Sequence, residues 1–244
     1  MHSAINGPSP RLCLAGHVRA CRVGGQVILL DLLHGRYIGV GGEAAQRLGD
    51  AIDGWPEGDL AGVAPARGAD VARLIGPLRA QRLLTHHTCE PRPVIDIEEP
   101  ARSLDVDDAM AATRTGVRDL RRFLQAAGVA GLWLRWRSMH GIASAVAARR
   151  PRPDHAVDGN AVQRLHGAMT TYEKLRPLVF TARDRCLFDS LALMNFLAGE
   201  RLFPSWVIGV KTGPFRAHSW VQSGDLVLND QHENVRRFKP ILVV

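Results

Sequence analysis

Hydrophobic positions in the first third of the chain alternate with polar ones in short runs, which is the pattern of half-buried strands. Three such runs predict strands over 17–23, 26–32 and 36–40. Helical spacing then predicts helices over 43–52 and 70–84, although Gly76-Pro77 is expected to break or kink the second helix. Three strands and about three short helices predict a small winged-helix-like domain.

A proline-rich stretch separates this domain from the rest of the chain. Residues 89–100 combine three prolines with several acidic residues, which is typical of a semi-extended linker. We therefore expect a first domain over 12–88 and a second over 101–244. The fold class predicted for the whole chain is α+β.

The second domain has mainly helical spacing. It predicts helices over 105–127, 132–148 and 159–175. The glycines within 128–131 are expected to form a turn between the first two. Trp133, Trp136 and His140 fall at i, i+3 and i+7, and this stripe is expected to face the core.

A further helix is expected directly after Asp184, which is a good N-cap residue. Apolar residues recur after it at helical spacing, namely Leu187, Leu191, Met194 and Ala198. Cys186 therefore falls in the first turn of this helix. There the backbone N–H groups and the helix dipole favour a thiolate over a thiol.

A β-hairpin is expected near the C-terminus. Its strands are predicted over 217–222 and 226–229, with a turn at 223–225. Counting outward from Gly224 makes His218 and Asp230 directly opposed partners, with Trp220 and Leu228 as the next pair on the same face. Opposed Cβ atoms lie about 4.5–5.5 Å apart, so the carboxylate could hold the imidazole.

Cys186, His218 and Asp230 are the residue types of a cysteine nucleophile, its base and an orienting acid. A cysteine on a helix is more often a small buried residue, and a strand histidine is more often a packing residue. For His166 and Tyr172, on the preceding helix, we expect such a packing or surface role. The symmetry about the turn favours the catalytic interpretation for the other three.

Four blocks carry a resemblance to a known family. They read CLFDSLAL, VIGV, PFRAHSWV and VLND, in that order. They are similar to the maturation proteases of lasso-peptide biosynthesis, the B proteins. That family has a mainly helical, transglutaminase/papain-like cysteine peptidase domain, which ends here in the β-hairpin. The resemblance covers about the last 60 residues. It implies Cys186 as nucleophile, His218 as general base and Asp230 as orienting acid. It also implies a precursor peptide as substrate and an ATP-dependent lasso cyclase as partner.

The first domain carries a second resemblance. Its segment VILLDLLHGRYIGVGGEAAQRL resembles PqqD-like domains, which bind the leader peptides of ribosomally made natural products. In that family the leader adds as a strand to the sheet edge and packs against the last helix. The leader contacts that we expect from this resemblance are Arg36, Tyr37, Ile38, Leu74 and Leu78. A β-wing that only caps the catalytic domain is the alternative.

Charge argues against a nucleic-acid partner. The formal net charge is +7; residues 1–90 hold 9 basic and 8 acidic residues, which leaves 22 basic and 16 acidic residues downstream. The basic residues are mostly arginines interleaved with acids and form no dense run with aromatics. We interpret them as solvated helix faces.

The spacing of the cysteines and the hydropathy of the chain indicate the cellular compartment. The four cysteines have no C-x-x-C spacing, so neither a zinc site nor a disulfide framework is expected. The first ten residues lack the pattern of a secretion signal, and no apolar run approaches the length of a membrane span. We expect a reduced, cytoplasmic protein without metal, cofactor or membrane contact.

Overall fold

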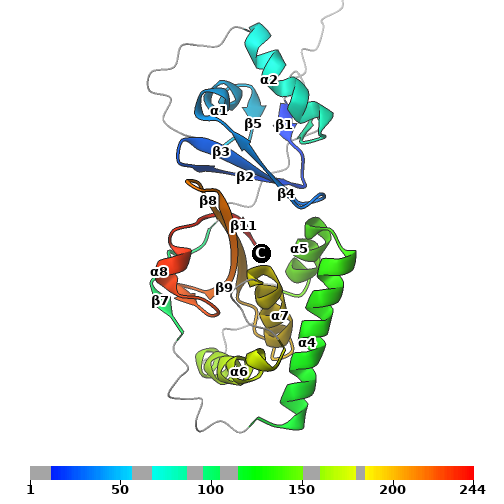
Figure 1. Ribbon diagram of the computed structural model, residues 1–244, viewed down its shortest axis with the longest axis vertical. Coiled ribbons are helices and arrows are strands. Elements are labelled where there is room, and N and C mark those ends of the chain that lie inside the picture. The colour runs from blue at the N-terminus through cyan, green and yellow to red at the C-terminus, as the bar shows by residue number, and fades with distance from the viewer. Residues whose placement is uncertain (1–11, 57–67, 87–95, 105–114, 151–159, 180–184) are drawn as a thin grey trace, which may run out of the picture. The chain divides into compact units, whose positions relative to one another are not determined.

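The computed structural model describes residues 12–56, 68–86, 96–104, 115–150, 160–179 and 185–244. The chain divides into two compact units, residues 1–94 and 95–244, and each is described separately (Figure 1). Both contain helices and antiparallel strands, so the α+β class is confirmed.

The first unit contains two small three-stranded sheets. Its described elements are β1 (Leu12–Leu14), β2 (Val18–Val23), β3 (Gln26–Asp31), β4 (Arg36–Val40), α1 (Gly42–Gly49), β5 (Ile52–Asp53), α2 (Gly68–Ala80) and β6 (Leu84–Thr85). One sheet has the order β2-β3-β4, so β4 lies at its edge. In the other, β1 lies between β5 and β6. The predicted three-stranded sheet is therefore present.

A buried carboxylate holds the turn that leads into β4. Asp31 is fully buried and accepts hydrogen bonds from the backbone N–H groups of Leu33 and His34. Its other oxygen contacts the His34 ring at 2.7 Å and Arg36 Nε at 3.1 Å. Burial alone would raise the pKa of Asp31, but these contacts outweigh it and the pKa is lowered. The start of the edge strand is thereby fixed.

The helices of the first unit differ from prediction at their ends. α1 stops at Gly49 because Ile52 pairs with β1 instead. α2 continues through Pro77 to Ala80, so of the predicted break or kink at Gly76-Pro77 the break is wrong. Pro77 lies in the last turn of the helix, where its missing N–H removes only one helical hydrogen bond.

The second unit combines a five-stranded sheet with helices. Its described elements are β7 (Arg102–Ser103), α4 (Val117–Trp136), α5 (Met139–Ala147), α6 (Ala161–Leu175), a 3₁₀ turn η1 (Arg176–Leu178), α7 (Cys186–Ala198), β8 (Ser205–Lys211), β9 (Arg216–Ser223), β10 (Leu226–Val227), α8 (His232–Val235) and β11 (Lys239–Val243). The sheet order is β11-β8-β9-β10-β7, and the predicted hairpin is its β9-β10 part. Strands β7 and β10 are parallel, and the other pairs are antiparallel.

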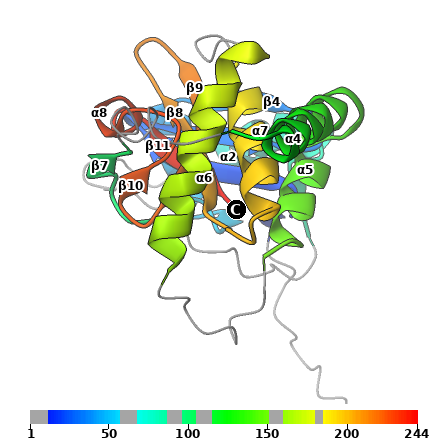
Figure 2. The same cartoon turned by 90° about the horizontal axis from the view of Figure 1, so that it is seen from below.

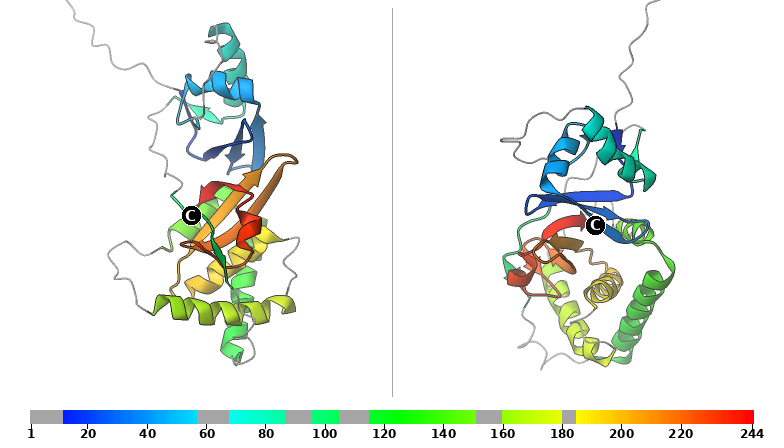
Figure 3. Two further views of the ribbon diagram at one scale, coloured as in Figure 1. Left: turned by 90° about the vertical axis from the view of Figure 1, so that its left-hand side faces the viewer. Right: turned by 45° about the horizontal axis from the view of Figure 1, so that its top comes forward.

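Helix α7 forms the centre of this unit. It contacts the sheet and the helices α4 and α6. Figure 2 shows it between α6 and α4, and the right-hand panel of Figure 3 shows it nearly end-on. Seven of its residues between Ser190 and Leu197 are buried, so it is buried on nearly all sides, as expected for a core helix. On the face of the sheet that carries Trp220 and Phe238, Gly209 of β8 has no space for a side chain, since an added Cβ would lie 2.7 Å from the Trp220 ring.

The predicted turn at 128–131 is wrong. Helix α4 runs without interruption from Val117 to Trp136, and Gly131 lies against Phe188 of α7. Gly131 therefore lies in the contact between α4 and α7, whereas an added Cβ at Gly128 would meet no atom within 4 Å. Trp133 is buried, as predicted for the apolar stripe, but Trp136 is 74% exposed.

Candidate active site

Cys186 occupies the first position of α7, and Arg185 is the N-cap. Asp184, the predicted cap, lies outside the described residues. The Cys186 sulfur interacts with the His218 side chain and with the backbone N–H groups of Ser219 and Leu187. Helix α7 and strand β9 together thus surround the sulfur with hydrogen-bond donors.

His218 and Asp230 are in direct contact. His218 Nε2 lies 2.5 Å from Asp230 Oδ2, which leaves Nδ1 as the ring nitrogen for the sulfur of Cys186. Asp230 Oδ1 accepts a hydrogen bond from the Gln231 N–H at 2.7 Å, and Asn234 Nδ2 lies 3.1 Å from Oδ2. The structure therefore brings together the three residues that the sequence singled out.

The predicted register of the hairpin is wrong, although the contact it predicted is present. Leu226 pairs with Ser223 and Val227 with Gln222, so the turn has two residues and the pairing is shifted by one. The predicted Trp220–Leu228 pair is replaced by a hydrogen bond from the Leu228 N–H to the Val221 carbonyl. Strand β10 ends at Val227 instead of 229.

The charges of the three groups depend on one another. Burial alone would raise the pKa of Cys186, but its hydrogen bonds and attraction to His218 outweigh burial and lower it. Burial alone would lower the pKa of His218, but hydrogen bonds to Asp230 and Cys186 raise it to about 9. Burial likewise opposes the ionised form of Asp230, whose pKa is nevertheless lowered by the hydrogen bond from His218. These shifts favour a thiolate–imidazolium pair held by a carboxylate.

These residues line a cavity of about 480 Å³. The His218 ring packs against Phe238 at a centroid distance of 5.2 Å and against Trp220 at 6.2 Å. The cavity is also lined by Arg176, Lys211 and Arg216. The site thus offers an apolar support for the imidazole and a positively charged rim.

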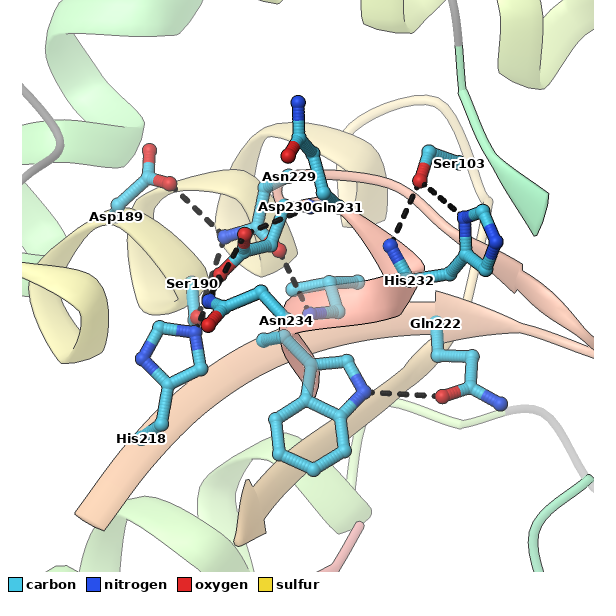
Figure 4. Close-up of polar contacts among 12 residues, drawn as sticks. Ser103, Asp189, Ser190, His218, Gln222, Asn229, Asp230, Gln231, His232 and Asn234 are labelled. Atoms are coloured by element: carbon cyan, nitrogen blue, oxygen red, sulfur yellow. Dashed lines mark hydrogen bonds and ion pairs between the residues drawn. The ribbon is translucent and has the colours of Figure 1, made fainter. Parts of the chain in front are cut away.

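A buried hydrogen-bond network lies beside the Cys186–His218–Asp230 group. Asp189, one turn after Cys186 on α7, is 2% exposed. It accepts hydrogen bonds from Tyr172 Oη at 3.0 Å and Asn229 Nδ2 at 2.9 Å, the second of which is drawn in Figure 4. Asn229 Oδ1 in turn accepts from the Val221 N–H at 2.8 Å. This network joins α6, α7 and β9 to the residue that precedes Asp230.

Sequence reasoning missed this network and assigned Tyr172 only a packing or surface role. The available signal was a carboxylate, Asp189, within the run LFDSLAL, whose other residues are apolar except for Ser190. Burial raises the pKa of Asp189, although hydrogen bonds from Asn229 and Tyr172 oppose the rise. The burial of Tyr172 itself and the nearby charge of Asp189 raise the pKa of Tyr172.

The segment 96–104 supports the loop that carries Asp230. Ser103 Oγ contacts His232 Nδ1 at 2.9 Å and accepts from the His232 N–H at 2.7 Å (Figure 4). Gln222 Nε2 donates to the Glu98 carbonyl at 2.7 Å, while its Oε1 accepts from Trp220. This segment thus holds β9 and the start of α8 together.

The expected leader-contact residues lie in the first unit. Arg36, Tyr37 and Ile38 belong to the edge strand β4. Leu74 is half-buried at the margin of the core on α2. Leu78 is 5% exposed and belongs to the core itself, so its side chain is not available to a ligand.

Neither a metal site nor a membrane-spanning helix is found in the described parts of the chain. They contain no cluster of three or more His, Cys, Asp or Glu side chains that could hold a metal ion. Among the described helices, none has the length and hydropathy needed to cross a bilayer.

Comparison with known proteins gives two similarities. Residues 124–243 match the family model described as Transglutaminase-like superfamily. A stretch of 48 residues is 44% identical to the microcin J25-processing protein McjB of Escherichia coli, and it covers 20% of this chain and 23% of McjB. The matched stretch of this chain thus spans about a quarter of that relative's length. No solved structure matches.

We expect Cys186 to react with iodoacetamide at a lower pH than an ordinary thiol. The thiolate persists until pH falls through its lowered pKa, and the imidazolium beside it is lost only as pH rises through about 9. Alkylation of Cys186, followed by peptide mapping against pH, should therefore show a reactive plateau below about pH 8.5, the usual thiol pKa. In His218→Ala the plateau should disappear. Identical profiles for both proteins would contradict the ion pair.

We expect Tyr172→Phe to lower the free energy of unfolding by about 1–3 kcal/mol at neutral pH, because Asp189 loses a buried hydrogen-bond donor. The loss should shrink on acidification, since a protonated Asp189 no longer needs that donor. Urea denaturation at several pH values measures this. Thr171→Val is the matched control, because it removes a hydroxyl whose hydrogen bond on the same helix is exposed to solvent, and it should change stability by less than about 0.5 kcal/mol. Equal effects of the two substitutions would contradict the role of Tyr172.

Proposed function

We propose that this protein is a cysteine peptidase of lasso-peptide maturation, which binds the leader of a precursor peptide and hydrolyses the leader–core bond. The observation that carries the proposal is the contact of Cys186 with His218, and of His218 with Asp230, in one cavity. The transglutaminase-like match over 124–243 and the local similarity to a microcin-processing protein support it.

The chemistry follows from the protonation states favoured at the site. The Cys186 thiolate attacks the carbonyl carbon of the last leader residue, and His218 donates its proton to the departing amine of the core. Water then attacks the thioester, with neutral His218 as general base, and the leader leaves as a free acid. Asp230 orients the imidazole and stabilises its charged form. The Cys186 N–H at the helix start is a candidate donor to the oxyanion.

Leader recognition is assigned to the first unit. Strand β4 is the edge of its sheet, so an extended peptide could add to it through backbone hydrogen bonds. Arg36, Tyr37, Ile38 and the half-buried Leu74 are the proposed contacts, and Leu78 supports them from the core. We further propose a cytoplasmic location and an ATP-dependent cyclase that receives the freed core N-terminus.

Two other functions use the same residues. A transglutaminase-like enzyme would transfer the acyl group from Cys186 to an amine instead of water. A non-catalytic adaptor would bind the leader without cleaving it. Incubating the pure protein with candidate precursor peptides and weighing the products by mass spectrometry separates the three: hydrolysed fragments, a cross-linked adduct or intact peptide.

We expect Cys186→Ala to abolish cleavage while leader binding and folding are retained. Asp230→Asn should lower the cleavage rate by about 10⁴, because the amide can present an N–H to the ring and favour the wrong tautomer. Single-turnover cleavage followed by mass spectrometry measures both. Cys13→Ala, which alters a buried cysteine of the first unit, is the matched control and should cleave normally once folded. If Cys186→Ala cleaved the precursor at the rate of the unsubstituted protein, Cys186 would not be the nucleophile.

We expect Leu74→Asp to weaken leader binding and so raise KM with little change in kcat, since the reacting groups lie in the other unit. Ala72→Asp places the same charge at an exposed position of α2 and serves as control. Fluorescence anisotropy of a labelled leader, with circular dichroism to check folding, measures the effect. If folded Leu74→Asp binds the leader as tightly as Ala72→Asp does, the assigned contact is wrong.

A further inference from the structure

Two cations lie directly opposite each other in the candidate site. Lys211 of β8 pairs with Arg216 of β9 in the register of the sheet, and both line the cavity that contains Cys186. Like charges at directly opposed positions of antiparallel strands repel each other and destabilise the pair. An anion bound between the two side chains would relieve this repulsion.

The carboxylates that line this cavity are already engaged. Asp189 is buried and bonded to Tyr172 and Asn229, and Asp230 is bonded to His218. Within the described residues, no carboxylate forms an ion pair with Lys211 or Arg216; Lys211 Nζ lies over the Phe238 ring, 4.8 Å from its centroid. Arg176, the third cation of the cavity, is paired with Glu173 at 2.7 Å. Among the described residues, the lysine and arginine charges of the cavity that have no carboxylate partner are therefore those of Lys211 and Arg216.

The positions of Lys211 and Arg216 determine how far from the cleaved bond an anionic group of the substrate would bind. Arg216 and His218 are two residues apart on one strand, so their side chains lie on the same face with Cα atoms about 7 Å apart. An extended peptide advances by about 3.4 Å per residue. A group held by Lys211 and Arg216 would thus belong to a residue about two positions from the bond attacked by Cys186.

We propose that Lys211 and Arg216 form a carboxylate-binding subsite, which selects peptides with an acidic group within about two residues of the cleaved bond. This inference rests on the proposed peptidase function and names the substrate class of that site. The acidic group is either an Asp or Glu side chain or a free C-terminal carboxylate.

A first test needs no peptide. The rate of Cys186 alkylation by iodoacetate, divided by the rate with neutral iodoacetamide, reports the local preference for a carboxylate. This ratio should fall about threefold in Lys211→Gln and about threefold in Arg216→Gln, as expected for one charge at about 7 Å in a water-like dielectric. The falls should shrink at high salt. Arg118→Gln and Arg121→Gln, exposed on α4 and away from the cavity lining, make the same charge change and should leave the ratio unchanged.

A second test uses precursor peptides in which each residue within two positions of the cleaved bond is in turn Asp or Asn. The Asp version should have a kcat/KM about tenfold higher at the recognised position, as expected from two such cations together, and the difference should vanish in Lys211→Gln/Arg216→Gln. A neutral peptide that ends two residues after the bond, as acid or as amide, distinguishes a C-terminal carboxylate from a side chain.

The outcomes separate the two proposals. An unchanged iodoacetate-to-iodoacetamide ratio in both single variants, or an equal fall in the α4 controls, would overturn the subsite. If Asp, Asn, acid and amide peptides are all cleaved at equal rates, the peptidase function stands and the subsite is wrong. If none is cleaved but the alkylation ratio falls as expected, the subsite stands and the peptidase function is wrong.

Discussion

The hydrogen bond between Asp189 and Asn229 joins the helix that begins with Cys186 to the segment that carries Asp230. Asn229 also ends the hairpin, because its side chain, in place of a backbone carbonyl, accepts from the Val221 N–H. The chain then leaves the sheet, and Asp230 turns toward His218. Had the strand register continued, His218 would oppose Gln231 instead. The geometry of the three groups thus depends on a side-chain contact that interrupts the sheet.

The pKa values of two carboxylates that line the same cavity, Asp189 and Asp230, are shifted in opposite directions. Burial dominates at Asp189 and raises its pKa, while the hydrogen bond from His218 outweighs burial at Asp230 and lowers its pKa. Two side chains with the same carboxyl group thus have different roles because their surroundings differ. Asp189 connects elements of the fold, and Asp230 stabilises positive charge on the imidazole.

The sequence predicted the proximity of Cys186, His218 and Asp230 but not the way it arises. Symmetric counting assumed a three-residue turn, whereas Gly224 adopts a positive φ of 59° in a two-residue turn. At 128–131 the glycines looked like a helix end, yet Gly131 permits contact with Phe188 of another helix. The first error concerns the length of a local turn. The second concerns a tertiary contact, which a local sequence pattern does not report. The buried network was missed for the same reason, since its members are distant in sequence.

The short strand β7 belongs to the sheet but precedes the region that matches the family model. The match to the family model begins at residue 124. However, β7 pairs with β10, Arg102 contacts Asp225 through two hydrogen bonds, and Ile97 packs against the core of the sheet. Exchanging this domain between proteins at residue 124 would remove an edge strand and leave β10 exposed. A junction between residues 94 and 95 would keep the sheet complete. The unit to exchange in chimeric proteins is therefore longer, by almost thirty residues, than the match to the family model.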